Sequence, residues 1–285
     1  MLSLFDDQLF MINKLSACVL GSSSSGNSTV IWNEKSSILI DCGLGPVYIT
    51  EQLRELGLRI QDLDGVFITH IHSDHVNEAT VRNLHKHCIP LYCPSPIEVH
   101  LLKKYRSIAD AKKEQFLNVI HKSDVELDTL TIRAFEVPHD SDGGCFGYNV
   151  FGDLNGKTKK ISVSTDMAEV TESALEHIAD SDIIVIESNY DVEMLERSGR
   201  PKWLKDRIRV GGHLSNDQCA ESILQIMNRS QVLPQMMALA HVSKQCNTNA
   251  LAYDCTVSAM DKHGMSQTTV CETYPQKPSR TMSIS

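Results

Sequence analysis

Three histidines and one aspartate are concentrated in six residues, immediately after a short apolar run. Residues 65–68 read Gly-Val-Phe-Ile, which is typical of a buried strand, and His70, His72, Asp74 and His75 follow it. Imidazole nitrogens and carboxylate oxygens are the ligands that zinc and similar divalent ions prefer. Four ligands on one tetrahedral ion would leave no place for water. We therefore predict two ions, one held by His70 and His72 and one by Asp74 and His75, each completed from elsewhere in the chain.

Length and composition favour a globular protein with one large domain. The chain has 285 residues, of which 41% are hydrophobic and 22% are charged, and no clear seam divides it. The net charge of -9 argues against indiscriminate binding of nucleic acid, although it leaves room for a local basic groove. We predict a single domain over residues 1–272, followed by a mobile tail over residues 273–285 that lacks periodicity.

The cysteines and the apolar runs indicate a cytoplasmic protein. Nine cysteines, an odd number, are scattered without a paired CxxC spacing, as expected of reduced thiols. No run approaches the roughly 20 apolar residues that a membrane helix needs. We therefore expect a cytoplasmic location and no membrane partner, and no obligate protein partner can be inferred from the sequence.

Alternating segments of strand and helix character predict an α/β fold with two sheets covered by helices. The expected strands are 15–20, 28–32, 37–41, 65–68, 130–137, 146–151, 160–165, 182–187 and 235–241. The expected helices are 46–56, 78–88, 96–105, 171–180, 216–228 and 248–262.

Three later strands each end in a candidate ligand. His139 follows the strand 130–137, Asp166 follows the strand near 160–165, and His241 closes the strand 235–241. A strand end is fixed by its sheet and faces loops that are open to solvent, which suits a site that holds metal rigidly and admits substrate. These residues are therefore predicted to complete the metal site.

The ligand pattern resembles the metallo-β-lactamase family. Asp41, the cluster from His70 to His75, His139, Asp166 and His241 are similar to its five successive motifs. The resemblance covers about residues 15–265 and implies an αββα four-layer sandwich. It implies that His70, His72 and His139 hold the first ion, that Asp74, His75 and His241 hold the second, and that Asp166 bridges them. Asp41 would orient a ligand imidazole. Zinc is the expected ion, with manganese or iron as alternatives.

Finer motifs resemble the YycJ/WalJ-type exonuclease-like branch of that family. They are residues 21–28, 187–191, 204–208, 212–216 and 240–248. This resemblance implies a DNA exonuclease of 5′–3′ polarity that acts on nucleic acid as its substrate. Two departures affect the expected substrate preference, because Glu78 stands where the fold commonly has glycine and Tyr190 where members often carry histidine.

The predicted chemistry is hydrolysis of a phosphodiester by a hydroxide that bridges the two ions. Asp74 would orient that hydroxide as well as binding metal. His213, in the loop 209–216, resembles a histidine that tRNase Z relatives place near the scissile phosphate, and Glu187 would hold its other nitrogen. The alternative is that His213 is a structural residue of a helix-capping loop.

Polar residues of the same motifs are predicted to contact substrate. The loop from Ser22 to Asn27 could cradle an anion, or it could be a hairpin turn without function. A basic stretch, 197–209, could follow a nucleic-acid backbone with Trp203 stacking on a base, or it could be a charged helix whose Trp203 faces the core. The predicted substrate contacts are Ser24, Asn27, Asn189, Asn216, Ser243 and Asn247.

Two other functions compete with a nuclease. A small-molecule thioester or lactone hydrolase of glyoxalase II type shares these ligands, because the same hydroxide can attack acyl carbons. That reaction has no need of the pair His213 and Glu187. A regulatory or scaffold protein with an empty site is disfavoured, because all seven ligand types are present.

Overall fold

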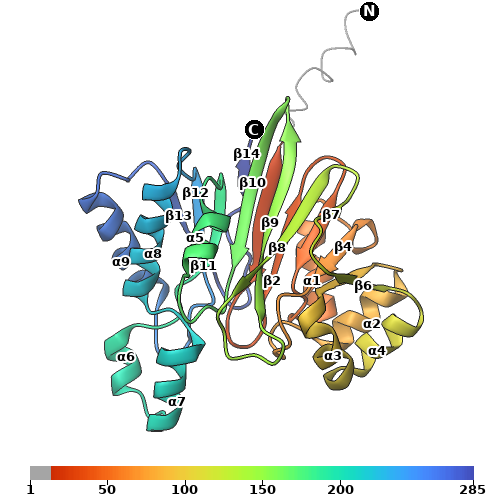
Figure 1. Ribbon diagram of the computed structural model, residues 1–285, viewed down its shortest axis with the longest axis horizontal. Coiled ribbons are helices and arrows are strands. Elements are labelled where there is room, and N and C mark those ends of the chain that lie inside the picture. The colour runs from red at the N-terminus through yellow and green to blue at the C-terminus, as the bar shows by residue number, and fades with distance from the viewer. Residues whose placement is uncertain (1–13) are drawn as a thin grey trace, which may run out of the picture.

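The computed structural model describes residues 14–285, so the first thirteen residues of the predicted domain lie outside the described residues. Two seven-stranded mixed sheets are packed face to face, as Figure 1 shows. The first sheet has the spatial order β14 (Met282–Ile284), β1 (Leu15–Gly21), β2 (Ser28–Trp32), β3 (Ser37–Ile40), β4 (Gly65–Phe67), β5 (Leu91–Pro94) and β6 (Leu117–Ile120). The second sheet has the order β13 (Thr269–Glu272), β12 (Met236–Ala240), β11 (Ile183–Glu187), β10 (Lys157–Ser164), β9 (Cys145–Leu154), β8 (Leu130–Val137) and β7 (Val125–Glu126).

Helices cover the outer face of each sheet (Figure 1). On the first sheet these are α1 (Pro46–Glu55), α2 (Glu78–Lys86), α3 (Ser95–Lys104) and α4 (Arg106–Lys113). On the second sheet they are α5 (Glu172–Ile178), α8 (Asn216–Arg229) and α9 (Asn249–Lys262). A short 3-10 helix, η1 (Ile60–Asp62), precedes β4. None of the helices within residues 14–285 is long and apolar enough to span a bilayer.

Alternating apolar side chains of the strands build three hydrophobic cores. In β3, Ile38 and Ile40 face the second sheet, whereas Leu39 between them packs under the helices of the first sheet. In β11, Val185 faces the first sheet and Ile184 packs under α5 and α8. Because successive strand side chains point to opposite faces, nearly continuous apolar strands serve both layers at once. The αββα four-layer sandwich expected from the sequence is confirmed.

The C-terminal segment is ordered, which differs from the mobile tail predicted for residues 273–285. Strand β14 adds to the edge of the first sheet by antiparallel pairing of Leu15 with Ile284, and Met282 is fully buried. Ser279 accepts a hydrogen bond from the amide of Val19 at 3.0 Å. The segment carries no periodicity because only three residues of it form a strand, whose partner lies at the other end of the described chain.

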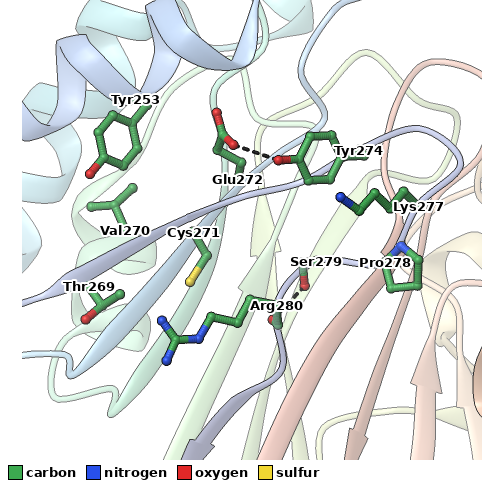
Figure 2. A pocket seen from close by; sticks show the side chains of 10 residues that line it. All are labelled: Tyr253, Thr269, Val270, Cys271, Glu272, Tyr274, Lys277, Pro278, Ser279 and Arg280. Carbon is green, nitrogen blue, oxygen red and sulfur yellow. Dashed lines mark hydrogen bonds between the residues drawn. The ribbon is translucent and has the colours of Figure 1, made fainter. Parts of the chain in front are cut away.

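A cavity of about 650 Å³ lies between β13, α9 and the segment after β13. Figure 2 shows its lining, in which Tyr274 donates a hydrogen bond to Glu272. None of the predicted metal ligands lines this cavity. The site expected from the sequence is therefore elsewhere.

Candidate metal centre

Every predicted ligand, together with the orienting residue Asp41, lies after the carboxyl end of a strand, at one edge of the sandwich. Asp41 follows β3, the residues from His70 to His75 follow β4, His139 follows β8, Asp166 follows β10 and His241 follows β12. Three of these residues have left-handed backbone, with φ of 61° at Asp41, 59° at Asp166 and 54° at His241. Such a conformation costs a non-glycine residue about 1 kcal/mol or more. The chain thus turns sharply at three strand ends to present these side chains.

Gly43 brings the loop after β3 against the turn after β4. A Cβ atom at Gly43 would lie only 1.7 Å from the carbonyl oxygen of Asp74, so only glycine fits. Hydrogen bonds fix the same approach: the amide of Cys42 donates to the carbonyl of His75 at 3.0 Å, and that of Asn27 donates to the carbonyl of Asp74 at 2.7 Å. Close backbone packing therefore holds the ligand turn in place.

The first cluster consists of His70, His72 and His139. Nδ1 of His72 lies 3.0 Å from Nε2 of His70 and 3.3 Å from Nε2 of His139. The opposite nitrogens have other partners: Nδ1 of His70 lies 2.9 Å from the hydroxyl of Thr69, and Nδ1 of His139 donates to the carbonyl of Gly212 at 2.7 Å. These contacts fix the rings so that lone pairs converge on one point.

The second cluster consists of Asp74, His75 and His241. Oδ2 of Asp74 lies 3.4 Å from Nε2 of His241 and 3.6 Å from Nε2 of His75. Asp41 lies behind this cluster, with Oδ2 at 2.6 Å from Nδ1 of His75. The same carboxylate accepts a hydrogen bond from the Thr69 hydroxyl, which touches His70. Asp41 thus has the contact expected of a residue that orients a ligand imidazole, and it reaches both clusters.

Asp166 lies between the clusters. Its Oδ2 is 3.0 Å from Nε2 of His75, and its Oδ1 is 3.7 Å from Nε2 of His139. It is buried, with 2% of its surface exposed. The seven predicted ligands are therefore brought together, in groups whose ligand atoms lie close enough to share an ion.

The donor set fits divalent cations. Two ligand atoms on one tetrahedral zinc lie roughly 3.3 Å apart, given bonds of about 2.0–2.1 Å, and the contacts within each cluster lie close to that separation. Oδ2 of Asp166 and Nε2 of His241 are buried, and although other ligand atoms lie near them, neither forms a well-aligned hydrogen bond among the described residues. Buried polar atoms normally have partners, so these two atoms fit a site that binds a cation.

The clusters differ in their protonation. Burial lowers the pKa of His72 to about 4 and lowers the pKa of His70 and His139 as well. Burial also works against a charged His241, but Asp166, Asp74 and Glu187 outweigh it and raise the pKa of His241 to about 10. Neighbouring carboxylates, Asp166 first, likewise raise the pKa of His75 well above its usual value despite burial.

Glu187 connects the second cluster to His213. Its Oε1 lies 2.7 Å from Nδ1 of His241 and 2.9 Å from Nδ1 of His213, and its Oε2 accepts the amides of Leu214 and Met167. Burial opposes ionisation of Glu187, but the two imidazoles lower its pKa to about 2. The contact of Glu187 with His213 was expected from the sequence, whereas its contact with His241 was not.

A cavity of about 280 Å³ opens onto both clusters. Ser24 and His213 line it, as expected of residues that meet substrate. Arg200 and Arg207 also line it, and sequence reasoning did not single them out as site residues. A dense basic stretch was the only signal, because the helix that carries Arg207 is too short to show which face points to the site.

The other five predicted substrate contacts are buried and hydrogen-bonded to the protein. Asn27 donates to Asp74, and Asn189 donates to the carbonyl of His241 at 2.7 Å. Asn247 donates to Asn216 and to the carbonyls of residues 188 and 189, while the Ser243 hydroxyl accepts the amide of residue 246. In this structure Asn27, Asn189, Asn216, Ser243 and Asn247 hold the ligand loops, and their contact with substrate stays a prediction.

The two departures from the family pattern have structural roles. Glu78 begins α2 and accepts the amides of Arg106 and Ser107, which joins α2 to α4. Tyr190 is 4% exposed and packs with Leu195 and other apolar side chains beside the site. Neither residue displaces a predicted ligand.

Comparisons with known proteins identify the family of this chain. Residues 36–235 match the family described as the beta-lactamase superfamily domain. The chain is 32% identical over 239 residues to the exodeoxyribonuclease WalJ of Streptococcus pneumoniae, which covers 82% of this chain and 84% of that protein. It is 27% identical over 249 residues to the exodeoxyribonuclease YycJ of Bacillus anthracis, which covers 86% and 89%.

Solved structures share the fold at low sequence identity. Yeast PDE1, in its unliganded form, has a TM-score of 0.67 and 12% identity over 94% of this chain and 99% of that chain. The metallo-β-lactamase fold protein YhfI from Bacillus subtilis has a TM-score of 0.66 and 12% identity over 95% and 100%. Together with the family match and the relatives above, these findings show that the chain belongs to the β-lactamase superfamily, among the metal-dependent hydrolases of metallo-β-lactamase fold and YycJ/WalJ type.

Proposed function

We propose that the protein is a dinuclear metal-dependent exonuclease that releases nucleotides from DNA in the 5′–3′ direction. The observation that carries the proposal is the placement of Asp166 between two ligand clusters, with His213 facing the same cavity. The names of the relatives, which are exodeoxyribonucleases, support the substrate and the reaction. We propose zinc as the ion, with manganese or iron as alternatives, because imidazole and carboxylate ligands accept all three.

The ligand clusters would hold two divalent ions, which when bound lower the pKa of a water molecule and polarise a phosphodiester. Asp74 is placed to orient the attacking water, because its carboxylate lies between His75 and His241 and is 19% exposed to the cavity. Burial opposes its ionisation, but His75 and His241 lower its pKa to about 2, so it accepts hydrogen bonds at neutral pH.

His213 is placed to act on the leaving oxygen. Its Nδ1 is held by Glu187 at 2.9 Å, which leaves Nε2 without a partner among the described residues. A ring held in this way can donate a proton or a hydrogen bond to the oxygen that departs from phosphorus. Glu187 acts through His213 and His241, so it is a positioning residue.

The basic lining of the cavity favours a phosphodiester over a small thioester or lactone. Arg200 and Arg207 line the same cavity as His213, and guanidinium groups recognise phosphate oxygens. Hydrolysis of a thioester requires neither these side chains nor His213. The nuclease is therefore the better supported of the two functions that share this ligand set.

We also propose that the protein acts in the cytoplasm, with nucleic acid as its substrate. All nine cysteines lie within the described residues, and none of them forms a disulfide. A reducing compartment is the usual place for such a set of thiols.

The direct test is degradation of DNA labelled at the 5′ or the 3′ end, with zinc or manganese added, by wild type and by His213→Ala. We expect wild type to release the 5′ label first, and His213→Ala to lower kcat by about 10²–10³-fold. The matched control is His87→Ala, which removes an exposed histidine at the end of α2 and should match wild type. Turnover of thioesters without release of nucleotides by wild type would overturn the proposal.

A further inference from the structure

A basic segment, residues 192–212, lies beside the metal centre and stands out from an acidic chain. It comprises α6 (Val192–Arg197), α7 (Lys202–Arg207) and the π-helical turn η2 (Ile208–Gly212). Figure 1 shows α6 and α7 projecting below the second sheet, apart from the layers that cover it. The segment carries six basic and three acidic side chains, a net charge of +3, whereas the whole chain has a net charge of -9. This segment is therefore a local region of net positive charge beside the metal centre.

The segment is anchored at one side and exposed at the other. Leu195 and Ile208 pack on Tyr190 and Cys246 in a small hydrophobic core. By contrast, α7 buries no residue, and the Trp203 side chain is 66% exposed. The sequence left open whether Trp203 faces the core, and the structure excludes that alternative. An exposed tryptophan on an anchored helix is a surface available for stacking.

Two arginines of the segment reach the cavity that opens onto the ligand clusters. Arg207 uses its Nε to donate to Asp140 at 2.6 Å, which leaves its terminal nitrogens without a partner among the described residues. Arg200 donates from one terminal nitrogen to Gln245 at 3.3 Å, in the loop after His241. A guanidinium has five donor hydrogens, so both side chains keep donors for a phosphate. Leu204, which follows Trp203, lines the same cavity.

We infer that the basic segment holds the DNA strand next to the scissile phosphate, with Arg200 and Arg207 on neighbouring phosphates and Trp203 stacked on a base further out. This inference rests on the proposed function and names the residues that would let the enzyme recognise a polynucleotide as its substrate. Phosphate contacts and base–aromatic stacking are the two sequence-independent ways in which proteins hold single strands. An exonuclease that shortens a strand of any sequence needs both.

The size of the cavity indicates that the strand is unpaired where it enters. Its volume of about 280 Å³ lies at the lower end of small-molecule pockets, which are about 300–1,000 Å³. Such a space admits a phosphate and its sugar, whereas a base pair needs more room. We therefore expect one strand to enter the cavity, so that a duplex would be opened at its end before cleavage.

The experiment compares two substrates of the metal-loaded enzyme, a 20-nucleotide single strand and the small diester bis(p-nitrophenyl) phosphate. Trp203→Ala is expected to raise KM for the strand by about tenfold, with a far smaller effect on the diester, and Trp203→Phe to restore most of the affinity. Arg200→Ala should also raise KM for the strand, and it should reduce the slope of log KM against log salt concentration by about 0.7, the value for one phosphate on a single strand.

Two control variants test whether any exposed residue has the same effect. Arg106→Ala removes an exposed arginine from α4, on the other sheet, and Val99→Ala removes an exposed apolar side chain from α3. Both should match wild type in KM and in salt slope. Equal behaviour of Trp203→Ala, Arg200→Ala and these controls on the strand would overturn the inference.

The outcomes also separate this inference from the proposed function. If wild type cleaves neither substrate with zinc, manganese or iron present, the phosphodiesterase proposal fails. If wild type cleaves the strand and the variants of the basic segment retain its KM and salt slope, the phosphodiesterase stands and only the role of the segment fails. If a blunt duplex is cleaved with the same KM as the single strand, selection of an unpaired strand is wrong.

Discussion

The two ligand clusters lie side by side, yet they differ in charge. The first cluster (His70, His72 and His139) consists of three imidazoles whose pKa is lowered by burial. The second cluster (Asp74, His75 and His241) contains a carboxylate and has two more carboxylates, Asp41 and Glu187, behind its imidazoles. The first is thus a set of neutral donors, whereas the second retains protons on its imidazoles until a cation replaces them. Two neighbouring clusters of similar residues can therefore differ in their protonation.

Removal of Asp166 is expected to have the largest effect, because this carboxylate lies between the two clusters. In Asp166→Ala, both ions should bind more weakly, and nuclease activity should fall on the order of 10³-fold or more, since polarisation by metal is worth several kcal/mol. Metal content by elemental analysis and the rate on labelled DNA measure this. Asp254→Ala, at an exposed position of α9, is the control. Retention of two ions by Asp166→Ala would contradict a shared ligand.

Neutralisation of Glu187 should act on one cluster. Glu187→Gln keeps the size of the side chain but removes the negative charge that faces Nδ1 of His241 at 2.7 Å. We expect affinity for the second ion to fall by about 10–100-fold, as for other residues that orient metal ligands. Affinity for the first ion should hold, because Glu187 makes no contact with His70, His72 or His139 within hydrogen-bond distance. Titration with zinc against a chelator distinguishes the two. Equal losses of zinc affinity at both clusters would show that Glu187 does not distinguish them.

A change of pH should separate the clusters by at least tenfold per unit, because both imidazoles of the second cluster hold a proton that an ion has to displace. The pKa of His241 is about 10 without metal, so an ion at the second cluster displaces a proton at pH 7 and binds more tightly as pH rises. The pKa of His72 is about 4, so the first cluster has no proton to lose between pH 6 and 8.

Zinc affinities of His139→Ala and of Asp74→Ala, taken at pH 6, 7 and 8, measure this separation. The first variant leaves the second cluster complete, and its affinity should rise with pH. The second variant leaves the first cluster complete, and its affinity should stay level. If the zinc affinity of neither variant changed with pH, the carboxylates would not be the cause of a difference in protonation between the clusters.

The sequence predicted the sandwich, and it singled out the residues that the structure gathers in the two clusters, because both have local signals. Apolar runs marked most of the strands, and the residues from His70 to His75 are contiguous. His139, Asp166 and His241 could be recognised because each ends a strand. Parallel strands bring such ends to one edge of a sheet, so a local signal was enough to predict a long-range assembly.

What the sequence did not predict depends on contacts between distant or very short segments. Strand β14 pairs with β1, which lies at the other end of the described chain. A strand of three residues is too short to predict that partner from sequence. Helices α6 and α7 have six residues each, too few to show periodicity. Likewise, polar residue type did not reveal that Asn189 and Asn247 are buried, because an amide suits a loop network as well as a substrate.

Crystals grown with zinc and measured at its absorption edge test the central claim most directly. The expected result is two anomalous peaks, one contacted by His70, His72 and His139 and the other by Asp74, His75 and His241, with an oxygen of Asp166 reaching both. A single peak, or peaks away from these side chains, would contradict it.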